Sequence, residues 1–209
     1  IVKISKLFKK HKPYLVHSND IKMHYFWSIM CKLFRIKHLW HQHSAFYTKK
    51  NIFFSSLSSE IITVSKYCKS SFTETMSKRA KVVFNPFEVK SYKKKVKIKQ
   101  NFKIISFVGS DKPQKGLDYF LDIANYFISK TKDKLVFFIF GNISKKEKII
   151  KNNPDLNIRF FDFDINYLDK LIKSDLVLLT SKNEGFGRVL VECMLSRIPF
   201  IARDSGPFK

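Results

Sequence analysis

Two glutamates, Glu184 and Glu192, stand eight positions apart on either side of a segment whose residue types could bind a phosphate group. The apolar run at residues 176–179 that precedes them is expected to form a buried strand. Gly185 and Gly187 allow the backbone to turn tightly and to approach a ligand without an intervening Cβ. A helix that begins near Gly187 would direct free N–H groups and the positive end of its dipole at a diphosphate. The pattern therefore predicts a strand–loop–helix unit that binds an anion.

Glu192 is the only charged residue in an apolar stretch of the expected helix, made of Val189, Leu190, Val191, Cys193, Met194 and Leu195. We therefore expect this helix to be buried. An ionised carboxylate in such a place is costly unless it is paired or hydrogen-bonded. Two readings stay open: Glu192 accepts hydrogen bonds from the hydroxyls of a ribose ring, or it pairs with Arg188 one helical turn earlier.

Short apolar runs alternate with longer helix-like stretches along the chain, and this pattern predicts the strands and helices that position residues 184–192. This alternation is typical of a parallel sheet covered by helices. The expected strands are residues 14–17, 38–40, 61–64, 81–84, 104–108, 135–140, 158–161, 176–179 and 200–202. The clearest helix is residues 116–130, whose single apolar stripe consists of Leu117, Phe120, Leu121, Ala124, Phe127 and Ile128.

The chain divides between residues 88 and 101, where the sequence is basic, lacks periodicity and follows the turn-like Asn85-Pro86. We place the lobe boundary after residue 95, which gives one α/β lobe at residues 1–95 and another at residues 96–209. About four strands precede the boundary, fewer than a complete doubly wound lobe contains. The chain also ends directly after a strand-like run, so we interpret it as truncated at both ends.

The net charge of +23 is unevenly distributed, since residues 1–100 contribute +18 and residues 101–209 contribute +5. This asymmetry favours a polyanionic partner for the first lobe, either an anionic membrane leaflet or nucleic acid. The alternative is that the lysines only form a surface solvated by water. The sequence has no apolar run long enough to span a bilayer. Its three cysteines lack the spacing of a zinc site or a disulfide framework, so a reducing compartment is expected.

Residues 184–192 read E-G-F-G-x-V-x-x-E, which resembles the E-x7-E signature of retaining glycosyltransferase family 4, the glycosyl transferases group 1. Residues 193–206 are similar to the family's small-residue helix end, Pro-led strand and Gly-rich turn. Residues 108–116, which end in Lys-Gly, look like the first turn of its C-terminal lobe. The first lobe has three segments similar to the family's later strands, at residues 14–18, 61–65 and 82–86. The resemblance implies an α/β GT-B fold, in which two Rossmann-like parallel-sheet lobes face a cleft.

The resemblance also implies roles for single residues. Glu184 would contact the hydroxyls of the donor sugar, Glu192 would hold the nucleotide ribose, and Lys115 would neutralise the departing diphosphate. Backbone N–H groups of residues 187–189 would contact the phosphates. The expected donor-binding residues are therefore Gly109, Lys115, Glu184, Gly185, Phe186, Gly187, Arg188, Val189 and Glu192.

Besides Glu184 and Lys115, the expected catalytic residue is a histidine, either His41 or His43. The family often places a histidine at the end of a strand in the first lobe, near the donor sugar. Alternation puts both side chains on the same side of an extended strand. His43 is favoured because it lies further toward the carboxyl end, where ligands bind in open α/β sheets. A purely structural role stays open for either histidine, and a metal role is disfavoured because no third ligand is evident.

Two features bear on how the phosphates are neutralised. Ser110 stands where the family commonly has an arginine, so either Lys112 replaces that charge or Lys115 acts alone. Asp162-Phe163-Asp164 has the spacing of a metal-binding pair, but it stands at a strand end and is interpreted as a loop. We therefore expect no metal and no other cofactor.

The implied function is transfer of a hexose-type sugar from a nucleotide-diphosphate sugar to a glycan or lipid-linked acceptor, with retention, in cell-surface polysaccharide or lipopolysaccharide synthesis. The protein would be cytoplasmic. Tyr25-Phe26-Trp27 and the basic first lobe suggest peripheral attachment to the anionic inner face of the plasma membrane, unless these aromatic residues pack in the core.

Two alternatives remain open. A basic nucleic-acid-binding module is suggested by charge alone, but no RNA-binding aromatic motif, helix-turn-helix or zinc-finger spacing supports it, so no nucleic acid is expected as a partner. A degenerate lobe that binds a sugar nucleotide without turning it over is suggested by Ser110.

Overall fold

The computed structural model of the protein describes residues 2–45, 48–88, 101–164 and 166–208. The chain forms two compact units: unit 1 contains Ile1–Phe87 and Glu184–Phe186, and unit 2 contains Glu88–Asn183 and Gly187–Lys209. The predicted lobe boundary between residues 95 and 96 lies outside the described residues. In the part of the chain that the structure describes, no helix is long and apolar enough to cross a membrane.

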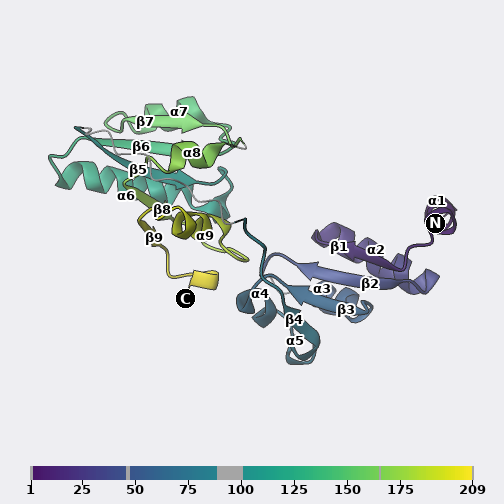
Figure 1. The fold of residues 1–209 in the computed structure, drawn as a ribbon. Helices are drawn as coiled ribbons and strands as arrows, with labels where there is room; N and C mark the ends of the chain where they lie inside the picture. The colour runs from purple at the N-terminus through teal and green to yellow at the C-terminus, as the bar shows by residue number, and fades with distance from the viewer. Residues whose placement is uncertain (1, 46–47, 89–100, 165, 209) are drawn as a thin grey trace. The chain divides into compact units, whose positions relative to one another are not determined.

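Unit 1 contains a parallel sheet of four strands in the order β1-β2-β3-β4 (Figure 1). The strands are β1 (Leu15–Ser18), β2 (Lys37–Gln42), β3 (Glu60–Thr63) and β4 (Ala80–Val82). The helices are α1 (Val2–His11), α2 (Ile21–Phe34), α3 (Lys49–Ser56), α4 (Lys66–Ser70) and α5 (Glu74–Arg79). Helices α2 to α5 each begin after a polar residue whose side chain accepts a hydrogen bond from a backbone N–H; these residues are Asp20, Thr48, Ser65 and Thr73.

Unit 2 contains a parallel sheet of five strands in the order β7-β6-β5-β8-β9. The strands are β5 (Lys103–Val108), β6 (Leu135–Phe140), β7 (Ile158–Phe161), β8 (Leu176–Leu179) and β9 (Phe200–Ala202). The α-helices are α6 (Leu117–Lys130), α7 (Lys146–Asn152), α8 (Tyr167–Leu171) and α9 (Arg188–Leu195). Two short 3-10 helices, η1 (Pro113–Lys115) and η2 (Gly206–Phe208), complete the unit.

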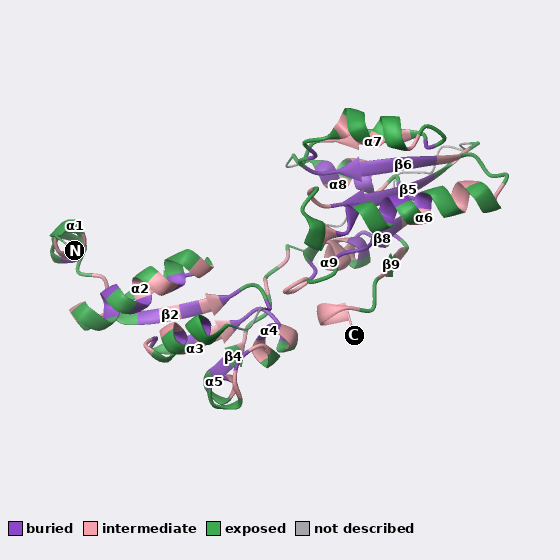
Figure 2. Cartoon of the chain, turned by 180° about the vertical axis from the view of Figure 1, so that it is seen from behind, coloured by how far each residue is buried: buried purple, intermediate pink, exposed green. Residues whose placement is uncertain are grey.

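The sheet of unit 2 is buried on both faces because β5 and β6 are apolar almost without interruption. Ile104 and Val108 of β5 face a core that includes residues of α8 and α9. Ile105 and Phe107, which alternate with them, face a second core formed with α6. Figure 2 shows the resulting contrast between the buried central strands and the largely exposed helix α7.

Strand positions predicted from the sequence agree closely with the structure. Strands β6, β7, β8 and β9 have the predicted bounds, and α6 begins one residue later than predicted because Gly116 is its N-cap. Strands β2 and β5 are longer than predicted, and β1, β3 and β4 each begin one residue away from the predicted position. These differences arise because pairing, rather than hydrophobicity, decides where a strand ends: Ser18 is polar, yet it pairs with Trp40 of the neighbouring strand.

Gly116 fixes the turn between β5 and α6 against the residues that follow β8. Its φ of 73° lies in the left-handed region, and a Cβ at this position would lie 2.2 Å from the carbonyl oxygen of Thr180. The same turn is held by a hydrogen bond of 2.8 Å that the Lys182 N–H donates to the carbonyl of Gln114. Glycine meets both the conformational and the steric requirement, so the turn and the segment after β8 form one rigid corner.

Unit 1 contains a buried polar network of histidine and serine side chains. Ser18 Oγ lies 2.6 Å from Nδ1 of His24 and 2.8 Å from Nε2 of His38, and Ser58 Oγ lies 2.9 Å from Nδ1 of His38. His24 also stacks on the ring of Trp40, with 4.1 Å between the ring centroids. Burial, reinforced by a neighbouring histidine, lowers the pKa of His24 to about 3 and the pKa of His38 to about 4.

The buried histidines predict that unit 1 loses stability between pH 6.5 and pH 5. In the unfolded chain these rings take up protons near pH 6.5, whereas in the folded unit they stay neutral to about pH 4 or below. The unfolded state therefore binds more protons as the pH falls, and each ring lowers the free energy of unfolding by about 1.4 kcal/mol per pH unit. Both tryptophans, Trp27 and Trp40, lie in unit 1, so urea unfolding followed by tryptophan fluorescence measures this unit.

A His38→Gln variant should show a shallower dependence of the urea midpoint on pH over this range, although its midpoint at pH 7 is lower. Most carboxylates titrate below this window, so they contribute little to the slope. Equal slopes for the wild-type protein and the variant would contradict a buried, neutral His38.

Replacing Gly116 with alanine should destabilise unit 2. The left-handed backbone and the contact with the Thr180 carbonyl together predict a loss of about 2–4 kcal/mol in the free energy of unfolding. The matched control is Asp122→Ala, at an exposed position six residues further along the chain in α6, and it should change the free energy of unfolding by less than about 0.5 kcal/mol. Urea unfolding followed by far-ultraviolet circular dichroism measures the free energy of unfolding of both variants. A Gly116→Ala variant as stable as the Asp122→Ala control would show that the corner is not rigid.

Candidate functional site

The segment after β8 turns into α9 at Gly187, as the sequence predicts. Gly187 has a φ of 85°, and a Cβ there would lie 2.3 Å from the Cε1 atom of Phe208 in η2. The first intrahelical bonds of α9 are donated by the N–H groups of Leu190 and Val191 to the Gly187 carbonyl. No side chain caps this end of the helix, so its first turn can present N–H groups to a ligand.

Glu192 has two partners within unit 2. The hydroxyl of Tyr167 in α8 donates a hydrogen bond to one carboxylate oxygen, and Nη2 of Arg188 lies 3.8 Å from the other. The Glu192 side chain is 12% exposed, whereas that of Arg188 is 70% exposed, so the tyrosine is the stronger partner. The pairing of Glu192 with Arg188 is thus present, and the proposed contact with a ribose stays a prediction.

Tyr167 was not identified from the sequence. Burial, together with its hydrogen bond to Glu192, raises the pKa of this tyrosine far above its usual value, so it stays protonated and donates. The residue lies 25 positions before Glu192, and the two meet because α8 and α9 pack on the same core. A half-buried carboxylate requires a donor, but only the topology of the sheet shows which residue supplies it.

The prediction that α9 is buried on all sides is wrong. Only Cys193 is buried; Met194 is 60% exposed and the other apolar residues of the helix are half-buried. The helix contacts β8 and β9, and its Glu192 also contacts Tyr167 of α8. Burial beside Glu192 raises the pKa of the Cys193 thiol to about 12, so this cysteine is not a thiolate nucleophile.

Lys115 lies at the end of η1, in the corner that Gly116 creates. Its carbonyl oxygen lies 3.4 Å from the hydroxyls of both Thr180 and Ser181. A Cβ on Gly109 would lie 3.4 Å from the Cβ of Lys115, so the two predicted donor-binding residues are neighbours. Unit 2 therefore brings Gly109 and the backbone of Lys115 close to the residues that follow β8, and the role of Lys115 in phosphate binding stays a prediction.

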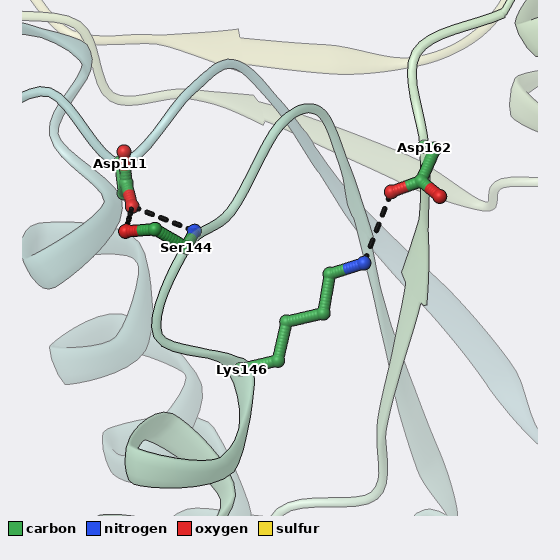
Figure 3. A network of polar contacts seen from close by, with 4 residues as sticks. All are labelled: Asp111, Ser144, Lys146 and Asp162. Atoms are coloured by element: carbon green, nitrogen blue, oxygen red, sulfur yellow. Dashed lines mark hydrogen bonds and ion pairs between the residues drawn. The ribbon is translucent and has the colours of Figure 1, made fainter.

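The loops after β5 and β6 are tied together beside this corner (Figure 3). Asp111 accepts hydrogen bonds from the backbone N–H of Ser144, at 2.8 Å, and from its hydroxyl. These hydrogen bonds lower the pKa of the Asp111 carboxyl. In the same view, Lys146 of α7 forms an ion pair of 3.0 Å with Asp162.

Asp162 and Asp164 lie outside regular secondary structure, which confirms the loop interpretation of this segment. Asp164 is 3.2 Å from Nζ of Lys170 and also accepts a hydrogen bond from the backbone N–H of Asn166. Both carboxylates of the apparent metal-binding pair are thus engaged by lysines.

Lys112, the possible replacement for the arginine absent at Ser110, lines a groove of about 660 Å³ between α6 and α7. Lys145 and Lys148 lie on the α7 side of this groove, Asp118 and Asp122 lie on the α6 side, and Asp111 also lines it. The carboxylates offset the charge of the lysines, so the groove has no net preference for an anion. Whether Lys112 supports Lys115 on a phosphate stays a prediction.

The predicted catalytic histidine lies at the carboxyl end of β2 in unit 1. The rings of His41 and His43 are 4.1 Å apart, which agrees with their placement on one side of the strand. His41 is part of a contact with His17, whose Nε2 lies 3.1 Å from Nδ1 of His41. Burial lowers the pKa of His41 to about 4 and also lowers the pKa of His43, so both rings are neutral at pH 7.

His43, and not His41, lines a small cavity of about 190 Å³. Asn19 and Asp20, which follow β1, and Gln42 and Ser44, at the end of β2, form most of its polar wall. Its position beyond the carboxyl ends of two parallel strands is the usual place for a ligand in this architecture. Among the described residues, no group of three or more His, Cys, Asp or Glu side chains is placed to hold a metal ion.

Residues 184–186 cluster with unit 1, where they approach the same strand end. A Cβ at Gly185 would lie 1.8 Å from the carbonyl oxygen of His43. The Gly185 carbonyl accepts hydrogen bonds from Ser65, at 2.5 Å, and from Cys68, at 3.2 Å. Phe186 packs near Phe84 and Phe87, with ring centroids 6.0 and 5.8 Å apart. Unit 1 therefore groups Gly185 and Phe186 with His43, and the contact with His43 requires glycine at position 185.

Comparisons with known proteins identify the family to which the chain belongs. The model of the family "Glycosyl transferases group 1" matches residues 88–209. An uncharacterized glycosyltransferase of Methanocaldococcus jannaschii is 30% identical over 155 residues, which cover 71% of this chain and 41% of that protein. The poly(ribitol-phosphate) alpha-N-acetylglucosaminyltransferase of Staphylococcus aureus is 31% identical over 109 residues, which cover 50% of this chain and 22% of that protein. The chain thus spans less than half the length of these curated relatives.

The fold is shared with solved structures. HepE of Anabaena, crystallised in complex with UDP, superimposes with a TM-score of 0.79 at 21% identity, covering 99% of this chain and 63% of that one. The two parallel-sheet α/β units correspond to the lobes of the GT-B fold. The family match, the relatives and the fold together show that the chain belongs to the glycosyl transferases group 1 family of GT-B glycosyltransferases.

Proposed function

We propose that the protein transfers a sugar from a nucleotide-diphosphate sugar to a glycan or lipid-linked acceptor, with retention of configuration. The observation that carries the proposal is the corner in unit 2, where Lys115 is held against the segment that leads into α9, a helix with no side-chain cap. A cation and the N-terminus of a helix are the groups that stabilise a departing diphosphate. Their combination in a glycosyltransferase family favours donor binding at this corner.

The donor is expected to bind with its phosphates at the N–H groups of residues 187–189 and its nucleotide ribose at Glu192. Tyr167 already orders one oxygen of Glu192, which leaves the second oxygen, 3.8 Å from Arg188, as the acceptor for a ribose hydroxyl. Arg188 is 70% exposed, so water screens its ion pair with Glu192. UDP is the first nucleotide to test because HepE was crystallised with it.

Transfer separates charge, so the two ends of the breaking bond need different partners. Lys115 and the α9 dipole would stabilise the negative charge that develops on the diphosphate. Glu184 would stabilise the positive charge that develops on the sugar. His43, whose pKa is lowered by desolvation and by the nearby His17, would hydrogen-bond to a sugar hydroxyl as a neutral ring. This scheme assigns no step to a metal or another cofactor.

The acceptor is proposed to belong to cell-surface polysaccharide or lipopolysaccharide synthesis. The named activity of the Staphylococcus aureus relative, which modifies a poly(ribitol-phosphate) chain, supports this class. We place the protein in the cytoplasm, attached peripherally to the inner face of the plasma membrane, where lipid-linked acceptors are found. The basic charge of the first 100 residues supports this location.

Calorimetry with UDP-, GDP- and ADP-sugars should find one nucleotide class that binds. Lys115→Ala and Glu192→Gln should each weaken that binding by at least about tenfold, because each removes a charge-assisted hydrogen bond to the donor. Glu184→Gln and His43→Ala should retain donor binding and lower kcat by about a hundredfold or more. The same variants are compared in a transfer assay with the donor that binds.

Lys146→Ala is the matched control, since it removes a lysine of the same unit that pairs with the exposed Asp162. It should leave the donor affinity unchanged. Equal losses in Lys146→Ala and Lys115→Ala would show a general effect of charge and would refute the assigned site. Donor binding without transfer in the wild-type protein would favour the non-catalytic lobe instead.

A further inference from the structure

A hydrogen bond between Tyr167 and Glu192 joins helices α8 and α9 at the carboxylate that is proposed to hold the nucleotide ribose. Tyr167 is 6% exposed and the side chain of Glu192 is 12% exposed. A carboxylate and a hydroxyl that leave water together cost more free energy than apolar side chains of similar size. A helix that only covered β8 and β9 would gain more from an apolar residue at position 192. The pair is therefore better explained by binding than by stability.

The direction of this hydrogen bond is fixed. Burial, together with the contact with Glu192, raises the pKa of Tyr167 far above its usual value, so the hydroxyl stays protonated. It donates to Oε2 of Glu192. The other oxygen, Oε1, lies 3.8 Å from Nη2 of Arg188, whose exposed side chain is screened by water. Glu192 thus has one oxygen on a buried donor and the other beside a solvated cation.

Two phenylalanine rings hold the tyrosine ring in place. Phe163, which follows β7, packs on Tyr167 with 4.4 Å between the ring centroids. Phe140 of β6 contacts the same ring edge-on, with a centroid distance of 6.4 Å. These contacts restrict rotation of the tyrosine side chain and therefore fix where its hydroxyl lies.

The acidic segment at residues 162–164 anchors the start of α8. The carbonyl of Asp164 accepts a hydrogen bond of 3.2 Å from the Tyr167 N–H. Its carboxylate lies 3.2 Å from Nζ of Lys170 in the same helix and accepts a hydrogen bond of 2.8 Å from the Asn166 N–H. Asp164, half of the apparent metal-binding pair, thus positions the helix turn that contains Tyr167.

We propose that Tyr167 is a positioning residue that makes Glu192 selective for a ribose. Held by the tyrosine, the carboxylate directs Oε1 to accept a hydrogen bond from a hydroxyl of the nucleotide's sugar ring. A site built to bind a hydroxyl rejects the analogue that lacks it, because a largely buried polar group is then left unpaired. Without the tyrosine, the carboxylate can turn toward Arg188, and the selectivity is lost. The inference rests on the proposed donor site and adds to it a residue that discriminates between ribonucleotides and deoxyribonucleotides.

Calorimetry with UDP and with its dideoxy analogue, which lacks both ribose hydroxyls, measures this selectivity as the ratio of two dissociation constants. The two nucleotides share the base and the phosphates, so a general loss of structure affects both equally. The wild-type protein should bind UDP at least about tenfold more tightly than the analogue. Tyr167→Phe keeps the ring and its packing, and it should lower the ratio to about threefold or less by weakening the binding of UDP alone.

A double-mutant cycle shows whether the tyrosine acts through the carboxylate. Glu192→Gln should also lower the ratio to about threefold or less, and the double variant Tyr167→Phe/Glu192→Gln should lose no further selectivity. Losses that add in the double variant would overturn the inference. An unchanged ratio in Tyr167→Phe would do the same, because the tyrosine would then only fill space.

The matched control is Tyr25→Phe, which removes a tyrosine hydroxyl that donates to the Asn51 side chain in unit 1. It should leave both dissociation constants unchanged. Far-ultraviolet circular dichroism shows whether each variant is folded. A loss of selectivity in Tyr25→Phe equal to that in Tyr167→Phe would contradict a specific role for Tyr167.

Failure of this inference and failure of the proposed function give different results. A wild-type protein that binds no UDP-, GDP- or ADP-linked ligand refutes the donor site, and the role of Tyr167 falls with it. If another nucleotide class binds, its diphosphate and the matching dideoxy analogue replace those of uridine. A wild-type protein that binds both nucleotides equally leaves a phosphate site in place and refutes only the recognition of ribose by Tyr167 and Glu192.

Discussion

The carbonyl oxygen of Thr180 occupies the space that a Cβ at position 116 would need, and the proposed donor site depends on this contact. It holds the turn after β5, which contains Lys115, against the segment after β8, which leads into α9. Because both strands are central in one parallel sheet, their carboxyl ends meet at the same edge. The glycine converts that general proximity into a fixed corner, where a lysine and the N-terminus of a helix can act on one diphosphate.

Away from this corner, the balance of charge differs between the two units. In unit 2, several carboxylates are engaged by hydroxyl, amide or ammonium groups, as the contacts of Asp111, Asp162 and Glu192 show. In unit 1, the lysines of α1 and α2 have no such acidic partners among the described residues. The charges of unit 2 are thus partly offset by contacts within the unit, whereas residues 2–34 of unit 1 carry seven lysines and one acidic residue.

The sequence was informative where a residue's role depends on its own backbone or its near neighbours. The apolar runs located β6 to β9, and Gly187 marked the start of α9. It was uninformative where a role depends on residues distant in sequence. Tyr167 meets Glu192, and Gly116 meets Thr180, only because of strand order. The burial of α9 was overestimated for a related reason, since apolar composition shows what a helix can bury but not which of its sides find a neighbour.

Hydrogen–deuterium exchange with and without a bound sugar nucleotide tests the central claim most directly, because the proposed phosphate ligands are backbone N–H groups. The account predicts that the donor slows exchange at residues 187–190 and in the turn at residues 109–116, with little change in α6 beyond its first turn. Protection confined to other segments, or none in these two while calorimetry shows binding, would contradict the placement of the donor at the corner of unit 2.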